Sequence, residues 1–131
     1  MIALDTNVLV RLALYDNVPQ AKAAERLLVR ARREQTELFV ADVVLCELVW
    51  VLTRRVGMSR DEIARALDQL LRTELVVVAE RAIVESALAA YRAGKGDFAD
   101  YLIREHARAA GAREVVTFDR ALKGETSFRV I

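Results

Sequence analysis

The sequence predicts an α/β protein with a mostly parallel, five-stranded sheet. Short apolar runs that suit buried strands recur along the chain, and stretches with apolar residues at helical spacing separate them. Parallel strands need long crossover connections, which a helix in each interval provides. With 131 residues the chain is long enough for one well-buried core, so we expect a single domain over residues 1–131.

Three strands and four helices are expected in the first 80 residues. Asp42 is expected to cap a helix that ends at Gly57, and Ser59 with Glu62 matches a capping box. The strands are expected at 2–4, 38–41 and 75–78, and the helices through Val8 to Ala13, after Pro19 to about Ala31, from 42 to 57 and from 59 to about 72.

The remaining residues predict two helices and two strands. A helix is expected from about 81 to 93, followed by the turn Gly94-Lys95-Gly96 and a helix from 97 to about 110. Gly111 ends that helix. Strands at 114–117 and 128–131 then complete the expected sheet.

Composition excludes several classes of protein and of site. The hydrophobic fraction of 54% and charged fraction of 30% indicate a globular chain, and the net charge of +1 indicates no particular partner. One His and one Cys exclude a metal site rich in nitrogen or sulfur. Cys46 has no disulfide partner, no basic leader begins the chain, and no apolar run approaches about 18 residues. We therefore expect a cytoplasmic protein without membrane spans.

Acidic side chains follow strands or begin helices. Asp5 and Asp119 come directly after expected strands, while Glu47, Asp97 and Asp100 lie in the first turns of expected helices. Strand ends and helix starts meet at one edge of an α/β sheet, so these acids can converge. Gathered carboxylates repel one another, and a divalent cation relieves the repulsion. The pattern predicts an oxygen-only site for Mg²⁺ or Mn²⁺ and a metal-dependent nuclease.

Each acid also has a purely structural interpretation. Asp5 and Asp119 can cap the turns that follow them, and Asp97 and Asp100 can be the N-cap and N3 residues of one helix. The last two roles are compatible with a site, because residues i and i+3 share a helix face. Glu47 lies in an apolar stretch, so it either faces solvent or is held by a metal or a basic partner.

Four short motifs, in order, resemble the PIN domain of small VapC-type toxin ribonucleases. They are Asp5-Thr6-Asn7, Leu45-Cys46-Glu47-Leu48, Asp97-Phe98-Ala99-Asp100-Tyr101-Leu102-Ile103 and Val116-Thr117-Phe118-Asp119-Arg120. The resemblance implies a three-layer α/β/α fold, cleavage of single-stranded RNA, a homodimer and an inhibitory VapB-like antitoxin. It also implies that Asp5, Glu47, Asp100 and Asp119 hold the metal, with Asp97 as an additional acid.

The expected chemistry is metal-assisted hydrolysis of a phosphodiester bond. Thr6 and Asn7 are expected to orient Asp5, and Thr117 to orient Asp119. Arg11 and Arg120 are candidates for binding phosphate. An alternative is a non-catalytic PIN-like module that binds RNA or a partner. A phosphatase or receiver domain fits poorly, because Asn7 stands where such a site would have a second acid. Apolar stripes at Leu27–Leu28, Leu48–Leu52 and Leu67–Leu71 favour the dimer.

Overall fold

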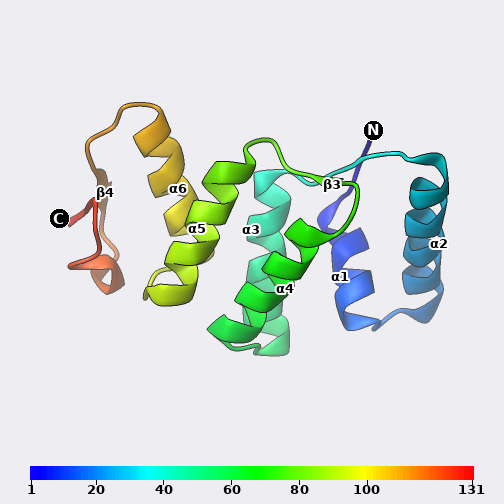
Figure 1. Ribbon diagram of the computed structural model, residues 1–131. Coiled ribbons are helices and arrows are strands. Elements are labelled where there is room, and N and C mark those ends of the chain that lie inside the picture. Colours follow the sequence, from blue (N-terminus) through cyan, green and yellow to red (C-terminus); the bar gives the residue numbers. More distant parts are fainter. The chain divides into compact units, whose positions relative to one another are not determined.

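Short strands and helices alternate along the chain in the computed structural model, which describes residues 1–131 (Figure 1). The chain forms two compact units, Met1–Ala79 and Glu80–Ile131, and each is described by itself. The first unit contains β1 (Ile2–Ala3), α1 (Thr6–Leu14), α2 (Val18–Glu34), β2 (Leu38–Phe39), α3 (Asp42–Val51), the π-helix η1 (Leu52–Val56), α4 (Arg60–Arg72) and β3 (Val76–Val77). The second contains α5 (Arg81–Ala93), α6 (Phe98–Ala109), β4 (Val115–Thr117), the 3₁₀ turn η2 (Arg120–Leu122) and β5 (Phe128–Val130).

The sheet of the first unit has three parallel strands in the order β1-β2-β3. The N–H of Leu4 donates to the carbonyl of Phe39 at 2.9 Å, and the N–H of Val40 donates to the carbonyl of Val77 at 2.9 Å. Helices α1 and α2 connect β1 to β2, and α3, η1 and α4 connect β2 to β3. The helical crossovers required by parallel pairing are therefore present, as the sequence predicted.

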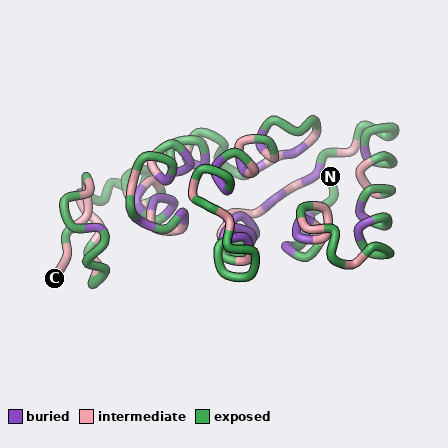
Figure 2. The backbone as a smooth tube through the Cα atoms, turned by 90° about the horizontal axis from the view of Figure 1, so that it is seen from below, coloured by how far each residue is buried: buried purple, intermediate pink, exposed green.

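The apolar stripes of α3 and α4 form the core of the first unit. Buried and exposed residues alternate along the helices, as Figure 2 shows. Leu48, Leu52, Leu67 and Leu71 are each at most 6% exposed, so they are buried in the single chain. These two stripes therefore offer no exposed apolar surface for a dimer, whereas Leu27 and Leu28 on α2 are half-buried. The dimer itself stays a prediction.

The second unit pairs β4 with β5 in parallel and packs α5 against α6. The sheet register places Val115 opposite Phe128 and Thr117 opposite Val130. Between the two helices, the rings of Tyr91 and Phe98 meet edge to face, with their centroids 6.0 Å apart. Phe98 and Tyr101 are the largest fully buried side chains of the unit, so α6 supplies much of its core.

Most helix ends lie where the sequence predicted them. Ser59 and Glu62 form the expected capping box at the start of α4. Gly57 follows η1 and ends the helix that was predicted over residues 42–57. Its φ of 71° lies in the left-handed region that favours glycine. Asp42 was wrongly expected to be an N-cap: Ala41 holds that position, and Asp42 begins the helix as an acid in its first turn. The π-helical turn of η1 was not predicted.

The α/β class and the parallel direction of the strands are confirmed. All five predicted strands are present, but they pair as a three-stranded sheet in the first unit and a two-stranded sheet in the second, and not as the single five-stranded sheet that was predicted. No helix is both long enough and apolar enough to cross a membrane.

Candidate functional site

Two candidate acids of the first unit lie at the end of β1 and on α3. Asp5 is exposed, occupies the N-cap position of α1 in extended conformation, and makes no capping hydrogen bond through its side chain. Thr6 is buried, and its hydroxyl donates to Glu47 Oε2 at 3.3 Å. Glu47 itself is exposed on α3. The first turn of α1 and the Glu47 carboxylate therefore meet, although they are 41 residues apart in sequence.

The contacts of Thr6, Asn7 and Arg11, the expected supporting residues of this unit, differ in part from those that were predicted. Thr6 was expected to orient Asp5, but its hydroxyl holds Glu47 instead, because the start of α1 faces α3. Asn7 is exposed and lines a groove of about 380 Å³ between α1 and α2, together with Arg11. Arg11 is already engaged, donating to Gln20 at 2.6 Å and pairing with Asp16 at 3.2 Å. A phosphate would have to compete with the Asp16 carboxylate for that guanidinium.

Asp97 and Asp100 lie together at the start of α6 in the second unit. Asp97 is the N-cap residue of the helix and Asp100 is its N3 residue, as the structural interpretation predicted. The backbone N–H of Asp97 donates to Asp100 Oδ2 at 2.8 Å. Asp97 is exposed and Asp100 is half-buried. The cap geometry fixes the Asp100 side chain and leaves both side chains on the same turn.

Asp119 follows β4 and is held through its neighbours. Its backbone N–H donates to the Thr117 hydroxyl at 3.0 Å, and its Oδ1 accepts from the N–H of Ala121 at 2.9 Å. Thr117 therefore fixes the backbone of Asp119, and Asp119 caps the η2 turn. Asp119 and Arg120 are both exposed, so this carboxylate and this cation are open to solvent at the strand end.

The three acids of the second unit share one electrostatic environment. Burial raises the pKa of Asp100, and the negative charges of Asp97 and then Asp119 raise it further, while the hydrogen bond from the Asp97 N–H opposes them. A carboxylate whose charge is disfavoured by its neighbours is a good ligand for a divalent cation, which removes the repulsion. The donors of this group are all carboxylate oxygens, the ligand type that Mg²⁺ and Mn²⁺ prefer.

Each unit thus contains one acid group, and we call these the α1/α3 group (Asp5, Glu47) and the α6/β4 group (Asp97, Asp100, Asp119). The first belongs to the first unit and the second to the second unit. In neither unit do three or more His, Cys, Asp or Glu side chains gather closely enough to hold a metal ion by themselves. Whether all four metal-ligand candidates serve one site stays a prediction.

The chain is thus an α/β protein with acids at strand ends and on helices: Asp5 after β1, Glu47 on α3, Asp97 and Asp100 at the start of α6, and Asp119 after β4. A sequence model of the PIN domain matches residues 2–124, and the chain belongs to the PIN domain family. It is 29% identical over 123 residues to a VapC ribonuclease of Aquifex aeolicus (strain VF5), across 94% of this chain and 90% of that protein. The family resemblance drawn from the four motifs is confirmed.

Proposed function

We propose that this chain is a metal-dependent endoribonuclease that cleaves single-stranded RNA, folded as one PIN domain over residues 1–131. The proposal rests on the retention of every acid that the resemblance implies, at a strand end or in an early helical turn. Its main structural support is the α6/β4 group, in which Asp97 and Asp100 share the first turn of α6 and Asp119 directly follows the β4 segment as the cap of η2. The similarity to a VapC ribonuclease supports the same chemistry.

We propose that Asp5, Glu47, Asp100 and Asp119 hold Mg²⁺ or Mn²⁺, and that Asp97 adds negative charge. A bound divalent cation supplies Lewis acidity, lowering the pKa of a water molecule and offsetting charge on the phosphoryl oxygens. The acid set provides only oxygen ligands, which both ions accept. Because the acids come from one chain, the proposed site needs no residue from a second copy.

The remaining side chains have supporting tasks in this proposal. Thr6 keeps the Glu47 carboxylate in place through its 3.3 Å hydrogen bond, and Thr117 keeps the backbone of Asp119 in place at 3.0 Å. Asn7 is exposed directly after Thr6 and can bind substrate or solvent. Exposed Arg120 is the better placed of the two phosphate-binding candidates, since Arg11 is paired with Asp16.

The products of cleavage test this proposal. With Mn²⁺, the purified chain should cut a pool of random-sequence single-stranded RNA internally, leaving 5′-phosphate and 3′-hydroxyl ends. Mass spectrometry of the fragments identifies the ends, and a duplex of the same length is the control substrate. Fragments ending in 2′,3′-cyclic phosphate would show attack by the ribose hydroxyl and contradict the hydrolytic mechanism. Binding of RNA without cleavage would favour the alternative of a non-catalytic module.

We further propose that the protein is the toxin of a toxin–antitoxin pair, acts in the cytoplasm and is inhibited by a VapB-like antitoxin. The similarity to a VapC ribonuclease supports this role. An antitoxin segment that placed an Arg against the carboxylates would form charge-assisted hydrogen bonds with them. It would thereby compete with both the cation and the RNA.

We also propose a homodimer, now through the exposed face of α3. Val43 and Trp50 are 62% and 59% exposed, and their spacing of seven residues places them on one helical stripe. Trp is enriched in the centres of protein interfaces. The interface proposed here uses these two side chains and none of the buried leucines.

The mass in solution tests the dimer. Light scattering at micromolar concentration should give twice the chain mass of 14.7 kDa, and Trp50→Glu should return the protein to the monomer mass. Val29→Glu is the matched control, because Val29 is 70% exposed on α2, and it should stay dimeric. A monomeric wild type would refute the dimer, and a dimeric Trp50→Glu would refute the α3 interface.

A further inference from the structure

We propose that Tyr101 and Glu125 are positioning residues for the α6/β4 acid group, because together they fix the turn Gly94–Asp97 from which Asp97 and Asp100 project. This inference rests on the proposed function, since it assigns the pair a task in metal binding. We call the two side chains and the turn amides that they bind the tyrosine clamp. Nothing in the four motifs singled out Glu125, and the Gly94-Lys95-Gly96 turn had no assigned role.

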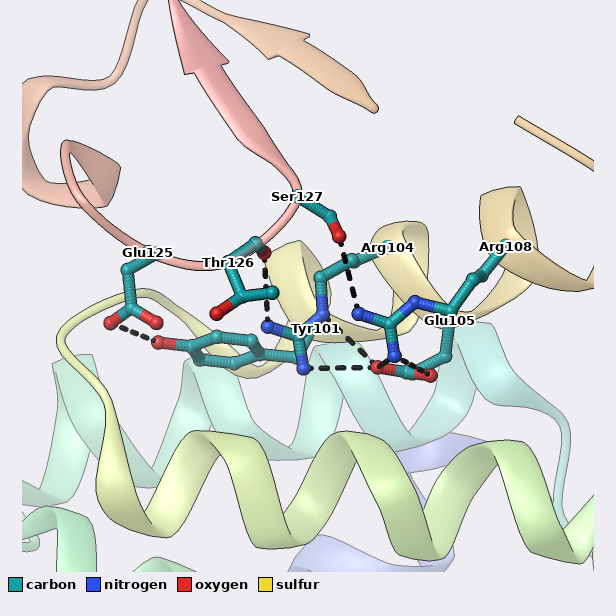
Figure 3. A network of polar contacts seen from close by, with 7 residues as sticks. All are labelled: Tyr101, Arg104, Glu105, Arg108, Glu125, Thr126 and Ser127. Atoms are coloured by element: carbon teal, nitrogen blue, oxygen red, sulfur yellow. Dashed lines mark hydrogen bonds and ion pairs between the residues drawn. The ribbon is translucent and has the colours of Figure 1, made fainter. Parts of the chain in front are cut away.

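The clamp is a closed set of hydrogen bonds. The N–H of Gly96 donates to the Tyr101 hydroxyl at 3.0 Å, and that hydroxyl donates to Glu125 Oε1 at 2.9 Å. The same oxygen accepts from the N–H of Lys95 at 2.9 Å. Figure 3 shows the Tyr101 hydroxyl pointing at the Glu125 carboxylate. Two consecutive turn amides are therefore held by one tyrosine and one carboxylate.

The two glycines allow the turn to lie against the tyrosine. A Cβ at Gly94 would overlap the Tyr101 hydroxyl, and a Cβ at Gly96 would lie 2.5 Å from Leu122 Cδ2. The same Cβ on Gly96 would lie 3.2 Å from Asp100 Oδ2. Close approach of this backbone requires glycine at both positions, which gives the Gly-Lys-Gly sequence a structural cause.

The clamp acts on the acids through two short covalent links. Asp97 follows Gly96 directly, and its N–H holds Asp100 Oδ2 at 2.8 Å. Asp100 precedes Tyr101 directly, so both ends of the Asp97–Asp100 turn are attached to the clamp. Carboxylates that repel one another move apart unless their backbone is fixed. A fixed backbone keeps them ready for a cation, and such supporting hydrogen bonds tune metal sites.

Buried Arg104 contacts the ring of Tyr101 and so supports the tyrosine clamp. The Arg104 guanidinium lies 5.1 Å from the centroid of the Tyr101 ring and 5.8 Å from that of Phe128. It pairs with Glu105 at 2.9 Å and donates to the carbonyl of Thr126 at 3.4 Å. Figure 3 shows these contacts joining α6 to the segment that carries Glu125. Arg104 thereby connects the segment that carries Glu125 to α6, the helix that carries Asp100.

The decisive variant is Tyr101→Phe, which keeps the ring and removes the hydroxyl. By isothermal titration calorimetry of metal-free protein, its affinity for Mn²⁺ should fall about tenfold or more, as is typical when an outer hydrogen bond of a metal site is removed. In cleavage assays the Mn²⁺ concentration for half-maximal rate should rise by the same factor. The rate at saturating Mn²⁺ should change far less, because the metal ligands themselves are intact.

Two further variants separate positioning from general stability. Glu125→Gln retains an acceptor oxygen and should recover most of the Mn²⁺ affinity that Glu125→Ala loses. Ser127→Ala is the matched control from the same segment: it removes the 3.3 Å hydrogen bond from Arg108 and touches neither the turn nor Tyr101. It should bind Mn²⁺ like the wild type.

Hydrogen exchange of the metal-free protein adds a readout independent of metal. The amides of Lys95 and Gly96 should be protected in the wild type and exchange faster in Tyr101→Phe. A folded Tyr101→Phe with wild-type Mn²⁺ affinity and wild-type exchange would overturn the clamp. A wild type that binds no Mn²⁺ would instead overturn the proposed function, so the two failures are distinguishable.

Discussion

Asp5→Asn and Asp100→Asn should each lower the rate of RNA cleavage at least about a hundredfold. Outer-shell changes alone cost 10–100-fold in metal sites, and these substitutions neutralise proposed ligands directly. Both changes keep the size of the side chain and remove one negative charge. Rates measured under single-turnover conditions with saturating Mn²⁺ check the expectation. Asp61→Asn is the matched control, because Asp61 is an exposed acid in the first turn of α4 and belongs to neither acid group.

The same variants should keep their stability, which distinguishes a site from a cap. The Asp5 side chain makes no capping hydrogen bond, so replacing it with asparagine removes no hydrogen bond from the start of α1. In the wild type, the Asp97 N–H donates to Asp100 Oδ2 at 2.8 Å. An asparagine at position 100 keeps a side-chain oxygen that can accept the same hydrogen bond. A purely structural Asp100 predicts the opposite result. Losing its charge near the helix N-terminus would then cost about 0.3–1 kcal/mol, with full activity retained.

The pH dependence of Asp100→Asn follows from the direction of its pKa shift. Burial first, and the charges of Asp97 and Asp119 next, raise the pKa of Asp100 in the folded protein. The protonated acid therefore stabilises the fold at pH below its unfolded pKa of about 3.9, and that stability is lost as the pH rises through the folded value. At neutral pH the melting temperature of Asp100→Asn should equal or exceed that of the wild type. Near pH 3, roughly, where Asp100 is protonated, the gain should vanish.

Local patterns predicted the elements because local forces determine them. The capping box at Ser59 and the left-handed end at Gly57 are contacts within a few residues, and both were confirmed. Asp42 was misplaced by one residue because an acid is favourable both as an N-cap and in the first turn. The π-helical turn of η1 matches none of the local patterns used to predict the helices.

Contacts between distant residues were the part that the sequence could not supply. The hydrogen bond from Thr6 to Glu47 joins residues 41 apart, and the bond from Tyr101 to Glu125 joins residues 24 apart. Two of the three apolar stripes that favoured a dimer are buried in the chain for a related reason. Apolar spacing identifies a helix face that is buried, but it does not say whether a sheet, a helix or a second chain buries it. Leu48 and Leu67 are buried in the single chain.

The positions of the acids could be predicted better than their partners. A carboxylate after a strand or at a helix start has a fixed place in any α/β fold. Asp97 and Asp100 lie at the start of α6 and Asp119 follows β4, as predicted, while their joint role in one site stays a prediction. The contacts of their neighbours depend on side-chain directions: the Thr117 hydroxyl accepts from the backbone N–H of Asp119, and the Thr6 hydroxyl donates to Glu47. The supporting roles of both residues stay predictions.

Removal of divalent cations should abolish cleavage altogether. Without a cation, the acids of the α6/β4 group repel one another and would repel the phosphate of the substrate as well. In excess EDTA the purified protein should show no cutting of single-stranded RNA, and Mg²⁺ or Mn²⁺ added beyond the chelator should restore it. Cleavage that persists in excess chelator would refute the metal mechanism and indicate a metal-free ribonuclease.

The cation should also stabilise the fold, which gives a measurement that no contaminating ribonuclease can imitate. A ligand that binds only the folded chain adds about 2.7 kcal/mol at a hundred times its dissociation constant. Mn²⁺ should therefore raise the melting temperature of the wild type by several degrees, and that of Asp61→Asn equally. Asp100→Asn should begin from an equal or higher value in EDTA and gain little from Mn²⁺, because the ligand that was replaced is also the source of the repulsion. An equal Mn²⁺ shift in Asp100→Asn and the wild type would place the cation elsewhere on the protein.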